Sequence, residues 1–212
     1  AILKLGMGLT AGICGGFWPI DEADAATSRS DENDPHPLPP ANYNKYAPEF
    51  RRSVIEYGGR HRPGTIIVDT SARQLWYVMP GKRAIRYGCA VGRDGFRWAG
   101  VADVGRKVMW PKWTPPPEMI ARSPEKAKWK NGMPGGPENP LGARALYLYQ
   151  NGNDTLFRIH GTNQPEYIGE SISSGCIRMT NEDVIDLYNR VKIGTIVVVL
   201  DRKAERVRVN MG

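Results

Sequence analysis

The chain has 212 residues, of which 41% are hydrophobic and 24% are charged, and its formal net charge is +7. This length fits one soluble domain with appended sequence, and the positive charge favours acidic partners. Three cysteines at long separations exclude a disulfide-rich scaffold. The sequence has no helix-turn-helix, zinc-finger or RNA-binding signature. We therefore expect the partner to be a polyanionic envelope surface and not a nucleic acid.

The first segment, residues 1–26, has the pattern of an export signal. Lys4 is followed by an apolar, glycine-rich stretch at residues 5–18, and residues 23–25 (Ala-Asp-Ala) suit cleavage by a signal peptidase. The apolar run is short for a membrane span. Lipidation of Cys14 is disfavoured because a bulky isoleucine precedes it. We expect a signal peptide or, if it is not cleaved, an N-terminal anchor that makes the only membrane contact.

Residues 27–61 are predicted to form a linker and an N-terminal extension. The stretch from residue 27 to about 46 is polar and proline-rich, with four prolines in residues 34–40. Such a segment buries too little apolar surface to offset the entropy of ordering it, which predicts an extended linker. The folded domain is then expected over residues 62–201, followed by a tail at residues 202–212.

The folded part is predicted to be mainly β with short helices, because apolar runs alternate with turn signals. Pro63-Gly64 and Pro80-Gly81 mark two of these turns. The predicted strands cover residues 65–69, 74–79, 84–91, 107–110, 145–149, 155–160 and 195–200. The third of these contains Cys89, which we interpret as a buried strand residue.

One helix is predicted near the end of the chain, before Gly194. Thr180 is a favourable N-cap, and Asp183 three residues later resembles a capping box. Apolar side chains then recur at helical spacing, at Val184, Leu187, Tyr188 and Val191. This pattern gives the helix one face that can pack on the sheet.

The long proline-rich segment at residues 111–143 is unusual inside a compact domain. Loops of this length are commonly functional lids. Trp113 and Trp129 could cover a substrate, or they could pack on the sheet as structural residues. A short helix is expected at residues 117–122.

The candidate chemistry lies at His160 and Cys176. A thiol becomes nucleophilic when a base or a positive dipole favours the thiolate, and Cys176 lies four residues before the predicted helix N-cap. Gly175 permits the tight backbone approach that an oxyanion hole needs, and Arg178 can grip a carboxylate. Each signal is weak by itself: a lone cysteine is commonly a buried apolar residue, and the serines before it could be turn residues.

The run from His160 to Met179 resembles the active-site signature of the L,D-transpeptidase family, the YkuD-type catalytic domain. The family pattern is a histidine followed, after a gap of this size, by Ser/Thr-x-Gly-Cys; here the second part is Ser173-Ser174-Gly175-Cys176. The resemblance extends over roughly residues 62 to 200. It includes the segments 63–69, 92–96, 110–116, 181–188 and 194–199.

The resemblance implies a sandwich- or barrel-like β fold in which the proline-rich segment is a lid insertion. It also implies that Cys176 attacks a peptidoglycan stem tetrapeptide, releases D-alanine and forms a thioester that an amine then resolves. His160 would be the base, and backbone N–H groups at residues 174–176 would stabilise the oxyanion, with Ser173 or a backbone carbonyl orienting the imidazole. The residues implied to bind substrate are Gly161, Thr162, Arg178 and Trp113.

Two departures from the family pattern affect these roles. Many members carry a second histidine where this chain has Ser174, and some carry asparagine where it has Arg178. The resemblance further implies acylation of Cys176 by carbapenems, a periplasmic or cell-envelope location, and no cofactor or metal.

Several alternatives remain open at this level. The acyl acceptor could be a second stem peptide, an envelope protein's amine or water; water would make the enzyme a carboxypeptidase or cross-link hydrolase. A non-catalytic peptidoglycan-binding module would have lost the Cys–His pair. A metal site at Cys176, His160 and His61 lacks close ligand spacing. A disulfide between Cys89 and Cys176 would silence the nucleophile.

Overall fold

The computed structural model describes residues 34–93, 98–173 and 175–200. The expected signal peptide or anchor, the first part of the linker, the C-terminal tail, most of the segment at residues 92–96 and Ser174 lie outside these residues. Within the described ranges, no helix is both long enough and apolar enough to cross a membrane.

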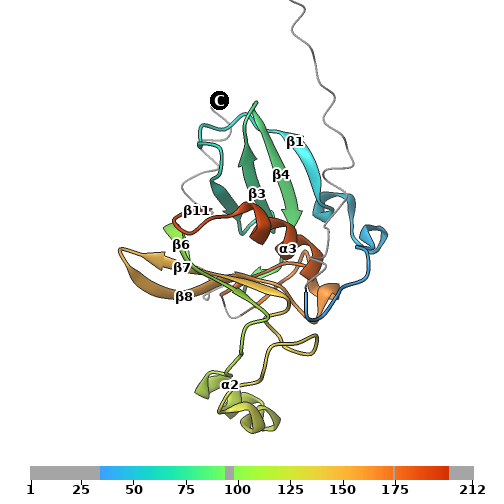
Figure 1. Ribbon diagram of the computed structural model, residues 1–212, viewed down its shortest axis with the longest axis vertical. Helices are drawn as coiled ribbons and strands as arrows, with labels where there is room; N and C mark the ends of the chain where they lie inside the picture. The colour runs from blue at the N-terminus through green and yellow to red at the C-terminus, as the bar shows by residue number, and fades with distance from the viewer. Residues whose placement is uncertain (1–33, 94–97, 174, 201–212) are drawn as a thin grey trace, which may run out of the picture.

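The fold is mainly β, as predicted. Nine strands form one mixed sheet in the order β1-β4-β3-β2-β11-β6-β7-β8-β10. The sheet bends so that its two halves lie on opposite sides of helix α3 (Figure 1). The expected sandwich is therefore built from one continuous sheet. Its strands are β1 (Ser53–Glu56), β2 (Ile66–Asp69), β3 (Gln74–Met79), β4 (Arg83–Gly88), β6 (Gly100–Met109), β7 (Arg144–Gln150), β8 (Asn153–His160), β10 (Ile177–Arg178) and β11 (Ile196–Leu200).

The predicted strands all exist, but pairing changes their lengths and adds others. Strand β6 begins at Gly100, seven residues earlier than its apolar pattern indicated, because it pairs with β11 as well as β7. The predicted third strand divides into β4 and the two-residue β5 (Val91–Gly92), which pairs with β9 (Ser171–Ser173). The short strands β1, β9 and β10 have little pattern of their own and form only through their partners.

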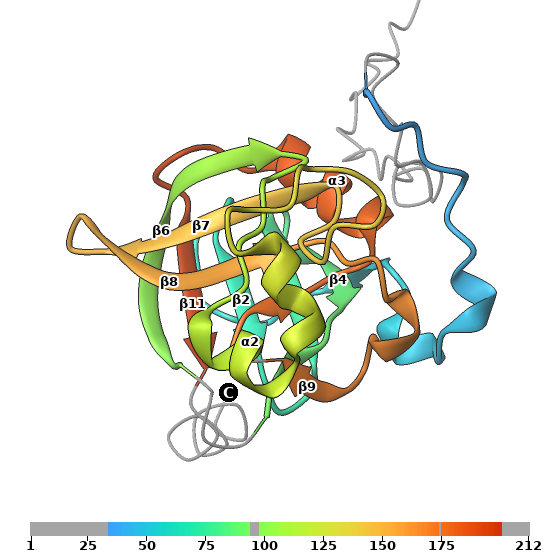
Figure 2. The ribbon, with the colours of Figure 1, turned by 90° about the horizontal axis from the view of Figure 1, so that it is seen from below.

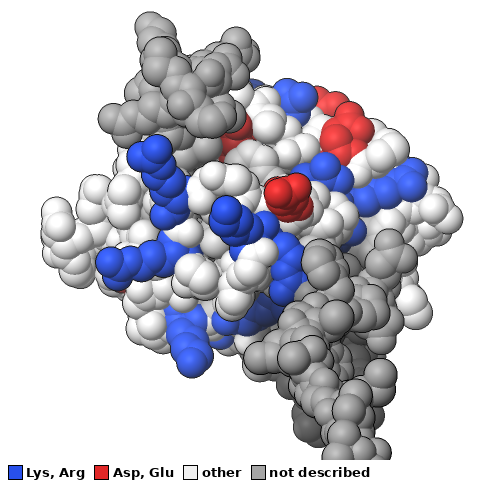
Figure 3. Space-filling view, turned by 90° about the horizontal axis from the view of Figure 1, so that it is seen from above, with Lys and Arg blue, Asp and Glu red and all other residues white. Residues whose placement is uncertain are grey.

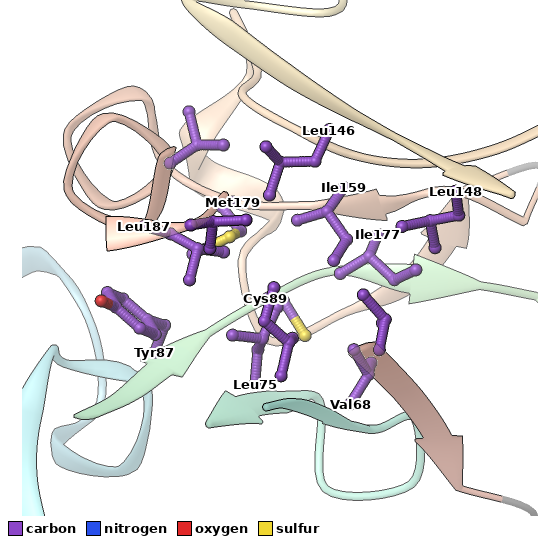
Figure 4. Packing of buried hydrophobic residues seen from close by; sticks show 14 of the residues in the cluster. Val68, Leu75, Tyr87, Cys89, Leu146, Leu148, Ile159, Ile177, Met179 and Leu187 are labelled. Carbon is purple, nitrogen blue, oxygen red and sulfur yellow. The ribbon is translucent and has the colours of Figure 1, made fainter. Parts of the chain in front are cut away.

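The core lies between the two halves of the sheet and includes the apolar face of α3 (Asn181–Arg190). Figure 4 shows side chains from both halves, such as Leu75 and Leu146, meeting Leu187 of the helix. Cys89 is fully buried in this cluster, as predicted. Both Cys89 and Cys176 are free thiols, so the disulfide alternative does not hold in this structure.

Helix α3 is capped as the sequence predicts. The Thr180 hydroxyl accepts the Asp183 N–H at 3.1 Å. The reciprocal half of a capping box is replaced, because the Asp183 carboxylate accepts a hydrogen bond from Tyr43 at 2.5 Å instead. The helix ends at Arg190, before the predicted stop at Gly194, and Val191 continues as extended chain.

The segment expected to be an extended linker, up to about residue 46, requires a correction over its described part, because residues 34–56 do not extend away from the domain. This part of the N-terminal extension packs on the domain through two 3₁₀ turns, Tyr43–Lys45 and Pro48–Phe50, and then pairs as β1 with β4. Its low apolar content is compensated by polar partners on the domain. Arg52, which is 7% exposed, lies 3.7 Å from a carboxylate oxygen of Asp183.

The proline-rich segment at residues 111–143, which we call the lid, is an ordered excursion between β6 and β7. It contains α2 (Pro117–Arg122), as predicted, and the 3₁₀ helix Pro124–Trp129. Both lie on the side of β7 and β8 opposite α3 (Figures 1 and 2). Asn139 holds the lid together internally: its buried side chain donates to the carbonyls of Pro111 and Pro134 at 3.0 and 2.9 Å.

Candidate active site

The register of β8 and β10 brings the two predicted catalytic residues to neighbouring strands. The strands are parallel, with Ile177 beside Ile159 and Arg178 beside His160. Both isoleucines point into the core. Because successive strand residues point to opposite faces, His160, Arg178 and Cys176 share the outer face, which is the face toward the lid.

The loop that carries Cys176 is fixed by Ser173. The Ser173 hydroxyl donates to the Cys176 carbonyl at 2.6 Å and accepts the Gly175 N–H at 3.1 Å. Gly175 has a φ of +122°, which requires glycine. Ser173 therefore shapes the loop rather than contacting the imidazole. The Gly175 N–H is already occupied, which leaves the Cys176 N–H as the better oxyanion donor of the two.

His160 is oriented by a backbone carbonyl. Its Nδ1 lies 2.6 Å from the Gly161 carbonyl oxygen. A carbonyl can only accept, so Nδ1 carries the hydrogen and Nε2 keeps its lone pair. Burial lowers the pKa of His160 to about 3, and the Arg178 charge acts in the same direction. His160 is thus a neutral imidazole whose Nε2 is unprotonated and can accept a proton, which a general base requires.

Cys176 is a neutral thiol in this environment. Burial raises its pKa above the ordinary value, although Arg158 and Arg178 act in the opposite direction. The expected thiolate is therefore not the resting form, because desolvation outweighs the nearby positive charges. Among the described residues, the sulfur has its hydrogen-bond contact with the Leu156 carbonyl at 4.0 Å and not with the imidazole.

A bulge in β8 presents that carbonyl. The pairing of β7 and β8 shifts register between Tyr147 and Tyr149, and Leu156 has a φ of +63°. Bulges next to active sites commonly re-aim backbone groups. Sequence reasoning missed this feature, because nothing in the β8 sequence marks a leucine for the left-handed conformation.

Two arginines flank the thiol, but only one is balanced by an acid. Arg158 forms two hydrogen bonds to the Asp154 carboxylate, at 2.7 and 2.8 Å, and stacks on Tyr147. Arg178 has no carboxylate within ion-pair distance among the described residues. A half-buried guanidinium without a counter-charge beside the Cys176 thiol can receive a carboxylate.

The loop after His160 is held by a residue that the sequence analysis did not assign. The Asn181 side-chain oxygen accepts the Thr162 N–H at 3.2 Å and the Ala143 N–H at 2.9 Å. It lies so close to Gly161 that a Cβ there would approach it to 2.2 Å. Asn181 thus joins the end of the lid to the His-Gly-Thr loop. In the sequence, only the position of Asn181 directly after the helix N-cap could have indicated this role.

The structure brings most, but not all, of the predicted site residues together. Thr162 is buried, and its hydroxyl accepts the Gln164 N–H, so it supports the loop. Trp113 is half-buried within the lid, where its backbone pairs with Met133. His61 contacts Tyr57 at 2.7 Å in an exposed loop. Within the described residues, no three His, Cys, Asp or Glu side chains gather as a metal site.

Comparison with known proteins assigns the chain to a family. Residues 63–199 match the YkuD L,D-transpeptidase catalytic domain, and the chain belongs to this family of cysteine-dependent acyltransferases. A probable L,D-transpeptidase of Escherichia coli, ErfK/SrfK, is 32% identical over 143 residues, which are 65% of this chain and 44% of that protein. The chain therefore spans less than half the length of this relative.

Solved structures support the same fold. A protein from Brucella melitensis, titled a probable carnitine operon oxidoreductase, is 51% identical with a TM-score of 0.50 and covers 75% of this chain and 99% of its own. The avibactam carbamoyl enzyme of the L,D-transpeptidase Ldtfm is 22% identical, also with a TM-score of 0.50, over 66% of this chain and 50% of its own. The second likeness concerns the fold alone.

Proposed function

We propose that this protein is a peptidoglycan L,D-transpeptidase with Cys176 as nucleophile and His160 as general base. The observation that carries the proposal is that Cys176 and His160 share one face of adjacent strands, two register positions apart, with the imidazole held as the Nδ1–H tautomer. A neutral thiol and a neutral imidazole must exchange a proton during attack, which is general-base catalysis.

The proposed reaction has two steps. In the first, His160 Nε2 takes the Cys176 proton as sulfur bonds to the carbonyl carbon between the third and fourth residues of a stem tetrapeptide. The Cys176 N–H stabilises the oxyanion, and the amide bond breaks as the imidazolium protonates the departing D-alanine. In the second step an acceptor amine attacks the thioester, giving its proton to His160 and restoring the thiol.

Arg178 is proposed to hold a carboxylate of the stem peptide. Its guanidinium is next to His160 in the strand register and has no acid partner among the described residues. Peptidoglycan in the cell envelope is the proposed partner, reached by export of the chain. The face opposite the lid carries many Lys and Arg and few Asp and Glu side chains, which suits a polyanionic envelope (Figure 3).

The nucleophile assignment is tested by carbapenem acylation. The protein is incubated with a carbapenem, and the intact mass of the wild type is compared with that of Cys176→Ala. We expect one covalent adduct on the wild type and none on the variant, with Cys89→Ala, which alters the buried thiol, still acylated. Absence of an adduct on folded wild type would contradict the assignment.

The acceptor is tested separately with purified sacculi. Muropeptide analysis distinguishes 3–3 dimers, which indicate a stem-peptide acceptor, from trimmed tripeptides, which indicate water. Loss of stem tetrapeptide without either product, together with protein that stays bound to the sacculus, would indicate a protein amine. Unchanged tetrapeptide would contradict the proposed substrate.

A further inference from the structure

Residues 34–38, which we call the strap, lie across the base of the lid. The lid leaves the sheet after Trp110 and returns to it at Arg144, and the Trp110 N–H donates to the Ala143 carbonyl at 2.8 Å. The two ends of the lid are therefore adjacent. The strap precedes the family match at residues 63–199, so the family resemblance assigns it no role.

Asp34 binds both ends of the lid at once. One carboxylate oxygen accepts the Trp110 indole N–H at 2.6 Å, and the other accepts the Arg144 guanidinium at 2.6 Å. The His36 N–H donates to the same carboxylate at 3.0 Å. Burial would raise the pKa of Asp34, but these hydrogen bonds and the Arg144 charge hold it below its usual range. The carboxylate is therefore charged at neutral pH.

The rest of the strap packs on the same place. The His36 ring meets the Trp110 ring edge to face, with centroids 4.8 Å apart. Leu38 packs against the small apolar cluster formed by Trp110, Ala143 and Ile185. Trp110 has a φ of +42°, which is uncommon for a large side chain and persists only where neighbours impose it.

The base of the lid, which the strap holds, is directly connected to His160. The Arg144 carbonyl accepts the Gly161 N–H at 3.0 Å, and Ala145 pairs with His160 across β7 and β8. From the lid side, the Ala143 N–H and the Thr162 N–H donate to the same Asn181 side-chain oxygen. A displacement of either end of the lid would therefore reach the backbone on both sides of His160.

We propose that Asp34 is a positioning residue for the active site, acting through Trp110 and Arg144 to hold the lid base against the His160 strand. Arg144 is 1% exposed, and Asp34 is its carboxylate partner. Removing Asp34 leaves a buried guanidinium without a counter-charge, and relieving that state requires the lid base to open toward water. The inference rests on the proposed function in one respect only, which is that catalysis is the activity that the lid supports.

The test compares Asp34→Ala and Asp34→Asn with a matched control, Asp186→Asn. Asp186 also joins the N-terminal extension to the domain, through Arg52, but the contacts of its side chain, with Arg52, Tyr87 and Arg190, are all outside the lid. Hydrogen exchange is followed for lid amides that are bonded in the structure, such as those of Met133, Asn139 and Gly142. The exchange of amides in β2 and β11 measures the stability of the core, and the rate of carbapenem acylation measures the reactivity of the site.

We expect lid amides to exchange faster in Asp34→Ala while core amides keep most of their protection. The maximal acylation rate should fall on the order of ten- to a hundredfold, because sub-ångström placement of the base controls it. Asp34→Asn keeps an oxygen that can accept the Trp110 indole N–H. Its lid exchange and acylation rate should therefore lie between those of the wild type and those of Asp34→Ala. Asp186→Asn should lower stability without selective exchange in the lid.

Two results would overturn the inference: lid exchange in the Asp34 variants equal to wild type, or equal loss of protection in lid and core. If Asp34→Ala does not fold, Asp34→Asn decides. If the wild type itself forms no carbapenem adduct, the proposed function fails, whereas lid exchange still tests the role of Asp34.

Discussion

At the scale of single residues, burial decides the resting charge state of His160 and Cys176, the proposed catalytic pair. Burial lowers the pKa of His160 to about 3 and raises that of the Cys176 thiol. Both groups are therefore uncharged at neutral pH. Nearby Arg178 lowers both pKa values, which disfavours imidazolium while it aids the thiolate. These resting states are consistent with the proposed mechanism, in which a proton is transferred during attack, rather than with a stored ion pair.

This charge state predicts a flat pH profile for acylation. Because the neutral forms dominate between the two shifted pKa values, kinact/KI with a carbapenem should change little from about pH 5 to about pH 8. His160→Gln should lower the rate by roughly 10²- to 10⁴-fold across this range. A decline in the wild-type rate centred on the ordinary histidine pKa would show that His160 titrates freely and would contradict the prediction.

At the scale of elements, the lid is held by side-chain amides instead of by a sheet or a long helix. Asn139 is fully buried and contacts the carbonyls of Pro111, Met133 and Pro134, and its oxygen accepts the Leu141 N–H. Prolines cannot donate backbone hydrogen bonds, so a proline-rich segment needs such a side-chain centre to become ordered.

Asn139→Ala should therefore loosen the lid selectively. It removes the partners of several buried backbone groups, at a cost of about 1–3 kcal/mol in the lid's local stability. The expected result is faster limited proteolysis within residues 111–143, with the thermal midpoint of the core nearly unchanged. Asn153→Ala is the matched control, because Asn153 is exposed at the start of β8 and, among the described residues, its side chain bonds only to the Asn151 carbonyl. Equal proteolysis in both variants would argue against Asn139 as the centre of the lid.

At the scale of the whole molecule, the N-terminal extension is attached through buried charges. The Arg52 guanidinium lies 3.7 Å from Asp183 and 3.5 Å from Asp186, and its nitrogens have no hydrogen-bond partner among the described residues. Burial raises the pKa of Asp183 to about 6, against the lowering effect of Arg52 and of the Tyr43 hydrogen bond. Arg52 thus keeps a buried carboxylate ionised near neutral pH.

Arg52→Met should destabilise the protein in a pH-dependent way. Without Arg52 the folded-state pKa of Asp183 rises further above its unfolded value, so the stability from protonated Asp183 is lost as pH rises through the folded pKa. We expect a loss of roughly 3–5 kcal/mol at pH 8 and a smaller loss at pH 5, measured by urea unfolding. Arg60→Met, at an exposed arginine, controls for the substitution. Equal losses at both pH values would contradict the coupling.

Local pattern accounts for much of the fold and for the identity of the site. The helix, with its N-cap at Thr180, and the strand at residues 74–79 were predicted because capping and apolar periodicity act over a few residues. The pair His160 and Cys176 was found through its family resemblance. The roles of Leu156 and Asn181 were not predicted, because a bulge and a bridging amide depend on neighbours distant in the chain.

The sequence by itself determined the position of the longer strands, the helix, the buried Cys89 and the residue types of the proposed catalytic pair, since these follow from short-range pattern and motif. Only the tertiary structure decided that residues 34–56, which include part of the expected linker, pack on the domain. It also decided that Gly161 orients His160, that the resting thiol is neutral, and that Asp34 meets Arg144. The physical reason is that desolvation and ion pairing depend on what packs around a group, and those partners can lie far apart in the chain, as Asp34 and Arg144 do at a separation of 110 residues.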